Sequence, residues 1–399
     1  MDYKVFQKKL IESFAGNMLM FGLNLFMPMV LTRLYGADIF GSYIYAITIV
    51  SVTLLLANLG MDMGLLYFIP KTGKKYVSAC FTINIATSIL SILALYFLMP
   101  ESIHAYLGLV WLLSVEQLFF SIFRARQDIR EFFAIKGFVY IGGLITISAL
   151  LYTLRGPLEV NIVVAAYTAA FCANIIYFIL CKDMFGKLEM HKAFITYSMT
   201  IIIGGVMGLL INYIDIVMIE AMMSKVDVAV YKVGAELAMI PSIFLTIVNT
   251  VFPPVISKLY GEGKIDEVRN MYEKLTRYLF MVSSLVIGLI LIFWHPILSL
   301  YGPEYLDGKM VLYYRAFGQL INASVGSVWY IVIMTGHPRI RLIGVTTSAI
   351  MNVTLNYLLI PRFGIDGAAL ASMVSTVFIN ILGFFVVKRI LNAKVYYII

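Results

Sequence analysis

Long apolar stretches alternate with short polar segments along the whole chain. An α-helix rises 1.5 Å per residue, so about 20 apolar residues cross the roughly 30 Å hydrocarbon core of a bilayer. The pattern predicts an all-α polytopic membrane protein with about 12 transmembrane helices. The first six cover residues 13–34, 43–69, 77–99, 103–123, 134–154 and 161–181, and the second six cover 194–223, 228–256, 275–299, 310–334, 340–360 and 366–388.

The composition supports a membrane environment. The 399 residues are 61% hydrophobic and 13% charged, whereas soluble domains average about 25% charged residues. The first apolar stretch is longer than the core of a signal peptide and has no small-residue cleavage motif after it, so we expect an uncleaved first span. The three cysteines lie in or beside predicted spans, and we expect no disulfide framework.

The positive charges alternate between the two sides of the predicted membrane. Of the 30 Lys and Arg residues, 23 lie at the N-terminus, in the odd-side loops and after the last span, and five lie in the opposite loops. Because cytoplasmic loops carry an excess of Lys and Arg, this asymmetry predicts that both termini are cytoplasmic. The net charge of +8 therefore indicates topology, and we expect no nucleic-acid partner.

The two halves resemble each other when the chain is shifted by 188 residues. The shift aligns Gly16 with Gly204, Asn24 with Asn212 and Tyr43 with Tyr231. An even number of spans in each half predicts parallel repeats around a central cavity, as in some transporters. We therefore expect an N-terminal half over residues 1–185 and a C-terminal half over residues 186–399.

Polar residues share faces of four predicted spans, where contact with lipid would favour none. We expect the first, second, seventh and eighth spans to line a wet cavity, with Pro28 and Pro241 bending the first and eighth. The candidate cavity residues for substrate binding are Lys232, Glu236, Asn212, Asp215, Asn24, Asn58, Arg33 and Arg315, and those for ion coupling are Asp215, Glu236 and Asp62.

Each charged candidate also has a structural interpretation. Arg33 can be an interfacial anchor, and Asp62, like Glu116, can make a helix–helix hydrogen bond. Lys232 and Glu236 can form an i,i+4 ion pair. Arg315 can join its helix to a neighbour. An uncompensated charge at mid-depth costs roughly 3 kcal/mol, which favours function for Asp215, Lys232 and Glu236.

Several chemistries lack their sequence signatures. The chain has no GxxxxGK[ST] phosphate loop, and its four His residues are scattered without HExxH or CxxC spacing. These signatures mark ATP hydrolysis and metal sites. We therefore expect no cofactor, no metal site and no enzymatic activity.

A resemblance to a known family covers nearly the whole chain. The passage from Leu31 to Pro70 resembles the opening of polysaccharide biosynthesis flippases, the Wzx-like branch of the multidrug/oligosaccharidyl-lipid/polysaccharide exporter superfamily. The segment from Asn212 to Leu237 and the motifs YGPEY, TGHPR and PRFGIDGAALAS follow in the order that the family uses.

The resemblance implies a function and roles for two residues. It implies flipping of undecaprenyl-diphosphate-linked oligosaccharide across a bacterial inner membrane by alternating access, with polysaccharide polymerase machinery as a possible partner. Lys232 resembles the family's cationic cavity residue, and Asp215 its frequent aspartate on the seventh helix. The predicted spans hold more acids than bases, which indicates proton or sodium coupling at one or two of the acids.

Three other functions compete with flipping. A cation-coupled drug or metabolite antiporter of the same superfamily would use Asp215 and Glu236 as its cation site. An integral-membrane polysaccharide polymerase or ligase has similar length, but that class usually carries a large outer loop that this chain lacks. A structural membrane scaffold would not need polar faces on four helices.

Overall fold

The computed structural model describes residues 3–126 and 128–391, and these residues form helices joined by turns and short loops, with no β-strand among them. The all-α prediction is therefore confirmed. The chain divides into two compact units, unit 1 over Met1–Leu209 and unit 2 over Leu210–Ile399. This division falls inside α8, whereas the expected boundary at 185/186 lies in the preceding loop. Parallel repeats and a central cavity stay predictions.

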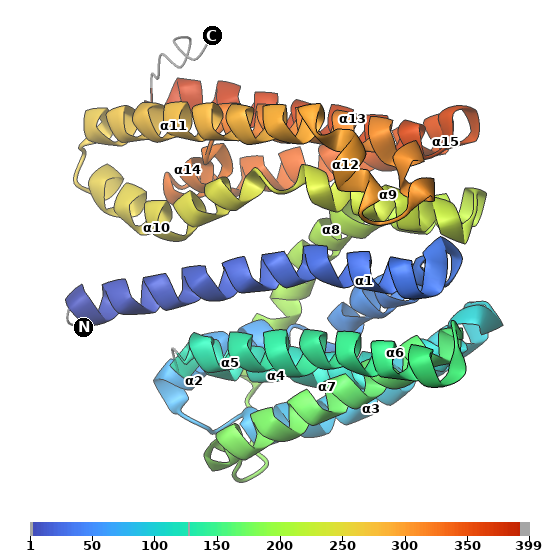
Figure 1. Ribbon diagram of the computed structural model, residues 1–399. Coiled ribbons are helices and arrows are strands. Elements are labelled where there is room, and N and C mark those ends of the chain that lie inside the picture. The colour runs from blue at the N-terminus through green and yellow to red at the C-terminus, as the bar shows by residue number, and fades with distance from the viewer. Residues whose placement is uncertain (1–2, 127, 392–399) are drawn as a thin grey trace. The chain divides into compact units, whose positions relative to one another are not determined.

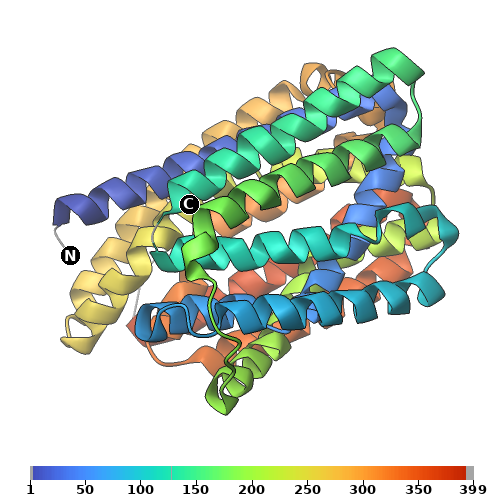
Figure 2. The ribbon, with the colours of Figure 1, turned by 90° about the horizontal axis from the view of Figure 1, so that it is seen from below.

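Unit 1 is built from the N-terminal helices. Its elements are α1 (Tyr3–Asn58), α2 (Met61–Thr72), α3 (Val77–Leu98), η1 (Glu101–Tyr106), α4 (Leu109–Arg126), α5 (Ile129–Ala134), the π-helical η2 (Ile135–Ile141), α6 (Gly142–Arg155), α7 (Glu159–Cys181), η3 (Lys182–Met184) and the first part of α8 (Lys192–Met222). Helices α3, α4, α6 and α7 lie side by side (Figures 1 and 2). The buried face of α4 contributes Leu118 and Ile122 to a core that also holds Tyr177 and Phe194.

Unit 2 contains the rest of α8 and the C-terminal helices. These are α9 (Lys225–Ala238), α10 (Ser242–Gly261), α11 (Ile265–Ile292), α12 (Trp294–Ser299), η4 (Pro303–Gly308), α13 (Lys309–Val325), α14 (Val328–Met334) and α15 (Pro338–Leu391). Helix α13 packs against α15, α11 and α9. A second core cluster forms around Tyr272, Ile331 and Val387.

The two longest helices each contain a break at a glycine. Gly36 interrupts α1 with φ 79° and ψ 168°, and Gly364 interrupts α15 with φ 59° and ψ −140°. Only glycine adopts such positive-φ conformations at little cost. The parts of each helix on either side of the glycine run in different directions (Figure 1). We expected Pro28 to bend the first span. The non-helical backbone inside α1 is at Gly36 instead, and Pro28 lies within the helix.

Both glycines lie between expected spans, as the apolar pattern indicated, but three expected spans are themselves divided. The predicted helix over 43–69 ends at Asn58, because Leu59 and Gly60 both have positive φ, and α2 begins at Met61. The predicted helix over 228–256 is divided into α9 and α10, which meet at 59°, with Pro241 in the break. This bend agrees with the expectation for Pro241. The predicted helix over 310–334 is divided into α13 and α14 at 43°.

The helices are long and apolar enough to cross a membrane many times. Among the described residues seven helices satisfy length and composition limits for a span, or up to nine if each bent pair is one span. Two of the seven spans, Phe14–Asn58 and Arg339–Leu391, contain the glycine breaks and have 45 and 53 residues. About 20 residues suffice for one crossing. The chain is a multi-pass membrane protein, and the count of 12 spans stays a prediction.

Candidate functional site

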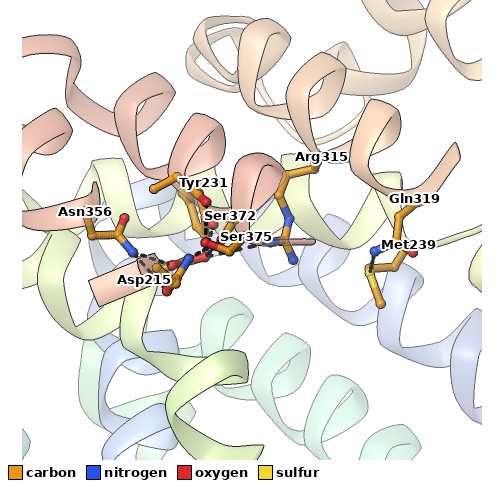
Figure 3. A network of polar contacts seen from close by, with 10 residues as sticks. Asp215, Tyr231, Met239, Arg315, Gln319, Asn356, Ser372 and Ser375 are labelled. Atoms are coloured by element: carbon orange, nitrogen blue, oxygen red, sulfur yellow. Dashed lines mark hydrogen bonds and ion pairs between the residues drawn. The ribbon is translucent and has the colours of Figure 1, made fainter. Parts of the chain in front are cut away.

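A buried carboxylate on α8 lies at the centre of a polar cluster in unit 2 (Figure 3). Asp215 is 5% exposed. Its Oδ2 accepts hydrogen bonds from the hydroxyls of Tyr231 and Ser372, and its Oδ1 accepts one from Asn356 Nδ2 at 2.8 Å. Three donors from α9 and both parts of α15 therefore converge on one acid. Such hydrogen bonding offsets the high cost of burying a carboxylate.

A guanidinium lies beside this acid without a close hydrogen bond to it. Nη1 of Arg315 on α13 lies 3.8 Å from Asp215 Oδ2, and the Arg315 side chain is 20% exposed. Arg315 Nε is buried and has no hydrogen-bond acceptor among the described residues. Asn356 Oδ1 is likewise buried and has no donor among them. Arg315 and Asp215 balance each other's charge at a distance that leaves both able to take another partner.

The local sequence explains how α15 and α9 supply this cluster. Asn352 and Asn356 are one helical turn apart, and Asn356 Nδ2 also donates to Asn352 Oδ1 at 3.1 Å. Asn352 Nδ2 in turn donates to Ser372 Oγ at 3.2 Å. Helix α9 begins with a capping box between Ser224 and Asp227, which fixes its first turn and so the register that directs Tyr231 toward Asp215.

A second pair of charges lies on α9. Lys232 Nζ is 2.9 Å from Glu236 Oε1, and each side chain is 27% exposed. This is the i,i+4 ion pair that the spacing indicated. No hydrogen bond or ion pair in the described part of the chain joins it to the Asp215 cluster. Both groups are partly accessible, so an anionic ligand could compete with Glu236 for Lys232.

The predicted site residue Asn58 belongs to an uncharged network in unit 1. Its Nδ2 donates to Gln117 Oε1 at 2.7 Å, and its Oδ1 accepts from Asn84 Nδ2 at 3.0 Å. Asn84 also bonds Ser114 at 3.0 Å. Asn58 is 2% exposed and Asn84 is fully buried. The network joins α1, α3 and α4, and its member Gln117 is exposed.

Other acids of unit 1 have basic neighbours. Glu116 Oε1 forms an ion pair with Lys136 Nζ at 2.5 Å, and the Glu116 side chain is 4% exposed. The sequence suggested a helix–helix hydrogen bond for Glu116, and its partner is a cation on the π-helix η2. Asp62 is half-buried in the first turn of α2 and interacts electrostatically with Arg124.

The remaining candidates are more accessible or outside the described residues. Asn24 and Arg33 on the first part of α1 are exposed. The side chain of Asn212 lies outside the described residues. Of the eight proposed binding residues, the structure thus brings together Asp215 with Arg315 and Lys232 with Glu236, and it places Asn58 in a network of its own.

Several cluster residues were not singled out from the sequence. They are Ser372, Asn352 and Asn356 in unit 2 and Lys136, Asn84 and Gln117 in unit 1. The i,i+4 asparagines within the apolar 340–360 span were a usable signal, because amides inside a bilayer need partners. In the described residues no group of three His, Cys, Asp or Glu side chains could hold a metal ion.

The fold is that of multidrug and lipid transporters. An inward-facing multidrug resistance MATE family transporter of the MOP superfamily aligns with TM-score 0.75 and 12% identity, over 93% of this chain and 94% of that one. The inward closed lipid II flippase MurJ aligns with TM-score 0.76 and 12% identity, over 95% and 87%. These likenesses show that this multi-pass protein has the fold of those two transporters.

The sequence comparison defines the family. The profile described as "Polysaccharide biosynthesis protein" matches residues 6–260, and the MatE profile matches residues 200–358. The chain belongs to the polysaccharide biosynthesis protein family, as the resemblance implied.

Curated relatives support this assignment. The capsular polysaccharide biosynthesis protein CapF of Staphylococcus aureus is 22% identical over 94% of this chain and 98% of its own length. The probable low-salt glycan biosynthesis flippase Agl15 of Haloferax volcanii is 22% identical over 60% of this chain and 49% of its own length.

Proposed function

We propose that this protein is a flippase for polyprenyl-diphosphate-linked oligosaccharide, with undecaprenyl diphosphate as the expected carrier. The family match over residues 6–260 is the observation that carries the proposal. The names of CapF and Agl15 connect similar chains with capsular polysaccharide and glycan flipping. The expected location is the inner membrane of a bacterium, with both termini cytoplasmic and polysaccharide polymerase machinery as a partner.

The two charged groups of unit 2 suit a diphosphate substrate. Lys232 and Arg315 are cations within apolar helices, and each is neutralised by one acid. A diphosphate in a poorly screened site gains strongly from fixed positive partners, and arginine can bind phosphate oxygens in a bidentate manner. We assign Lys232 and Arg315 to the diphosphate, with Glu236 and Asp215 as the partners that they exchange for it.

This exchange provides a route for ion coupling. A proton or a sodium ion that neutralises Asp215 removes the counter-charge of Arg315 and so frees its guanidinium for phosphate. Two hydroxyls and the Asn356 amide nitrogen contact the Asp215 carboxylate, and carboxylate and hydroxyl oxygens are among the ligands that hard cations prefer. Hydroxyls can rotate to accept instead of donate. Asp215 is therefore the proposed coupling residue, with Glu236 and Asp62 as further candidates.

A cation-coupled drug or metabolite antiporter is the second candidate function. The MatE match over residues 200–358 favours it. In that case Asp215 and Glu236 would bind the drug or its counter-ion directly, and no lipid-linked glycan would accumulate in the absence of the protein.

The test is to follow lipid-linked oligosaccharide in a deletion strain, with leaflet assignment by an impermeant glycosidase. Flippase function predicts accumulation in the inner leaflet and loss of surface glycan. Complementation with Lys232→Ala should fail at normal protein level, whereas Lys232→Arg should retain part of the glycan display. Normal leaflet distribution in the deletion strain, together with drug-stimulated proton exchange in vesicles, would support the antiporter instead.

A further inference from the structure

An apolar groove on unit 1 is separate from every charged site described above. It has a volume of about 280 Å³ and lies between α3, α4 and α7. Six aromatic side chains line it, which we call the aromatic groove: Phe81, Trp111, Phe119, Phe171, Phe178 and Phe185. Phe171 is 53% exposed, Phe178 51% and Trp111 39%. A continuous exposed apolar surface on a membrane protein is a surface for lipid or for a partner.

The groove has a direction along α7. Phe171, Ile175 and Phe178 follow one another at helical spacing, and all three line the groove. From Phe171 to Phe178 the helix rises about 10 Å at 1.5 Å per residue. This length and the volume of about 280 Å³ suit part of one hydrocarbon chain lying along the helix.

A folded loop closes the groove at the end of α7. The Phe185 ring lies 4.9 Å from Phe81 and 5.2 Å from Phe178 between centroids. Gly186 is fixed to α3, because its N–H donates to Ser78 Oγ at 2.8 Å and its carbonyl accepts from the same hydroxyl at 2.9 Å. The loop is therefore a built wall of the groove.

The same loop carries positive charge at this end. Lys182 comes one helical turn after Phe178 and is exposed, as is Lys187. Neither forms an ion pair with another described residue, whereas the neighbouring Asp183 is paired with Arg126 at 3.3 Å. Lys74 Nζ adds a third cation, 3.2 Å from the Asp183 carbonyl. An apolar groove that ends at lysines complements an acyl chain that ends at a phosphate.

We propose that the aromatic groove binds an anionic phospholipid of the surrounding bilayer. One acyl chain lies along Phe171 and Phe178 against Trp111, and the phosphate lies at Lys182 and Lys187. The occupant is a bilayer lipid, which is present at high local concentration beside this exposed groove. This site is distinct from the proposed binding of the transported diphosphate by Lys232 and Arg315.

Trp111 provides a direct probe of occupancy. The protein is reconstituted in nanodiscs of zwitterionic lipid that contain a fixed fraction of phosphatidylglycerol or phosphatidylcholine brominated on the acyl chains. The Trp111 contribution is the difference in tryptophan quenching between the parent and Trp111→Phe. We expect several-fold stronger quenching of Trp111 by the brominated anionic lipid than by the brominated zwitterionic lipid. Equal quenching by the two lipids contradicts the proposal.

A charge variant and its matched control locate the phosphate. Lys182→Gln with Lys187→Gln should abolish the preference for the anionic lipid. Arg155→Gln with Lys225→Gln removes the same charge elsewhere and should keep it. Loss of preference in both pairs means that net charge, and not the groove, selects the lipid.

A competition arm tests the choice of occupant. Unbrominated phosphatidylglycerol should restore Trp111 fluorescence at least as well as an equal amount of polyprenyl phosphate does. If polyprenyl phosphate displaces the brominated lipid more effectively, the groove holds the tail of an isoprenoid lipid and the proposal is wrong.

Discussion

The polar network around Asn58 in unit 1 and the polar cluster around Asp215 in unit 2 differ in charge. In unit 1 the network of Asn58, Asn84, Ser114 and Gln117 is neutral, and each member has a partner within it. In unit 2 the cluster around Asp215 is charged, its arginine is 3.8 Å away, and Arg315 Nε lacks an acceptor among the described residues. The neutral network has no charge to exchange, whereas the charged cluster, whose Arg315 Nε is unpaired within the described part of the chain, can exchange partners. We therefore expect the first network to contribute to stability and the second to contribute to function.

The largest expected effect on stability comes from removing the acid of unit 2. Asp215→Ala leaves three donors and the Arg315 charge without their acceptor, and removing one partner of a buried charged cluster costs about 3 kcal/mol. Chemical unfolding in mixed micelles measures this loss. The double variant Asp215→Ala/Arg315→Ala should recover part of it, because the orphaned cation is gone. Equal losses for the single and double variants would show that the two charges are not coupled.

The ion pair of unit 1 should cost somewhat less to break. Lys136→Ala leaves Glu116 buried without its 2.5 Å partner, although the 33% exposed lysine indicates partial screening. We expect a loss of about 2 kcal/mol. The matched variant Lys136→Met/Glu116→Met replaces both charges by apolar groups and should lie within about 1 kcal/mol of the parent. If the double variant is as unstable as Lys136→Ala, the loss of stability comes from altered packing and not from the unpaired charge.

The neutral network should affect stability without affecting transport. Asn84→Ala removes hydrogen bonds to Asn58 and Ser114, each worth about 1 kcal/mol. The expected loss is about 1–2 kcal/mol, with an unchanged flipping rate per folded molecule in proteoliposomes. If Asn84→Ala folds normally but flips tenfold more slowly, Asn84 is a functional residue, and the contrast between the two networks is wrong.

The smallest effect is expected at the exposed candidates of α1. Asn24→Ala changes an exposed side chain, and such substitutions usually alter stability by less than about 0.5 kcal/mol. Cysteine at the same position tests alternating access, because its labelling from one side should depend on substrate or ion. Inaccessibility from both sides in every condition would contradict a role for Asn24 in substrate binding.

Hydrophobic pattern predicted the fold class because the bilayer requires about 20 apolar residues for each crossing. The i,i+4 spacing of the two charges predicted the Lys232–Glu236 pair. The hydrophobic pattern also placed Gly36 and Gly364 between expected spans, where the structure has breaks. It did not predict the breaks within expected spans at Leu59–Gly60 and between Val325 and Val328, because nothing in the apolar pattern changes there. The partners of Asp215 were missed for a related reason. Asn356 and Ser372 lie 141 and 157 residues away, and no local spacing connects them.

The central claim is that Asp215 couples an ion to transport, and Asp215→Asn tests it most directly. Asparagine keeps the size and much of the hydrogen bonding of Asp215 but cannot titrate or supply a carboxylate. Flipping of lipid-linked oligosaccharide is measured in proteoliposomes with imposed and with collapsed proton and sodium gradients, with Asn84→Ala as the control for impaired packing. The account predicts that Asp215→Asn flips at least tenfold more slowly, no longer responds to either gradient, and still binds substrate. A normal rate with an unchanged gradient response would contradict it.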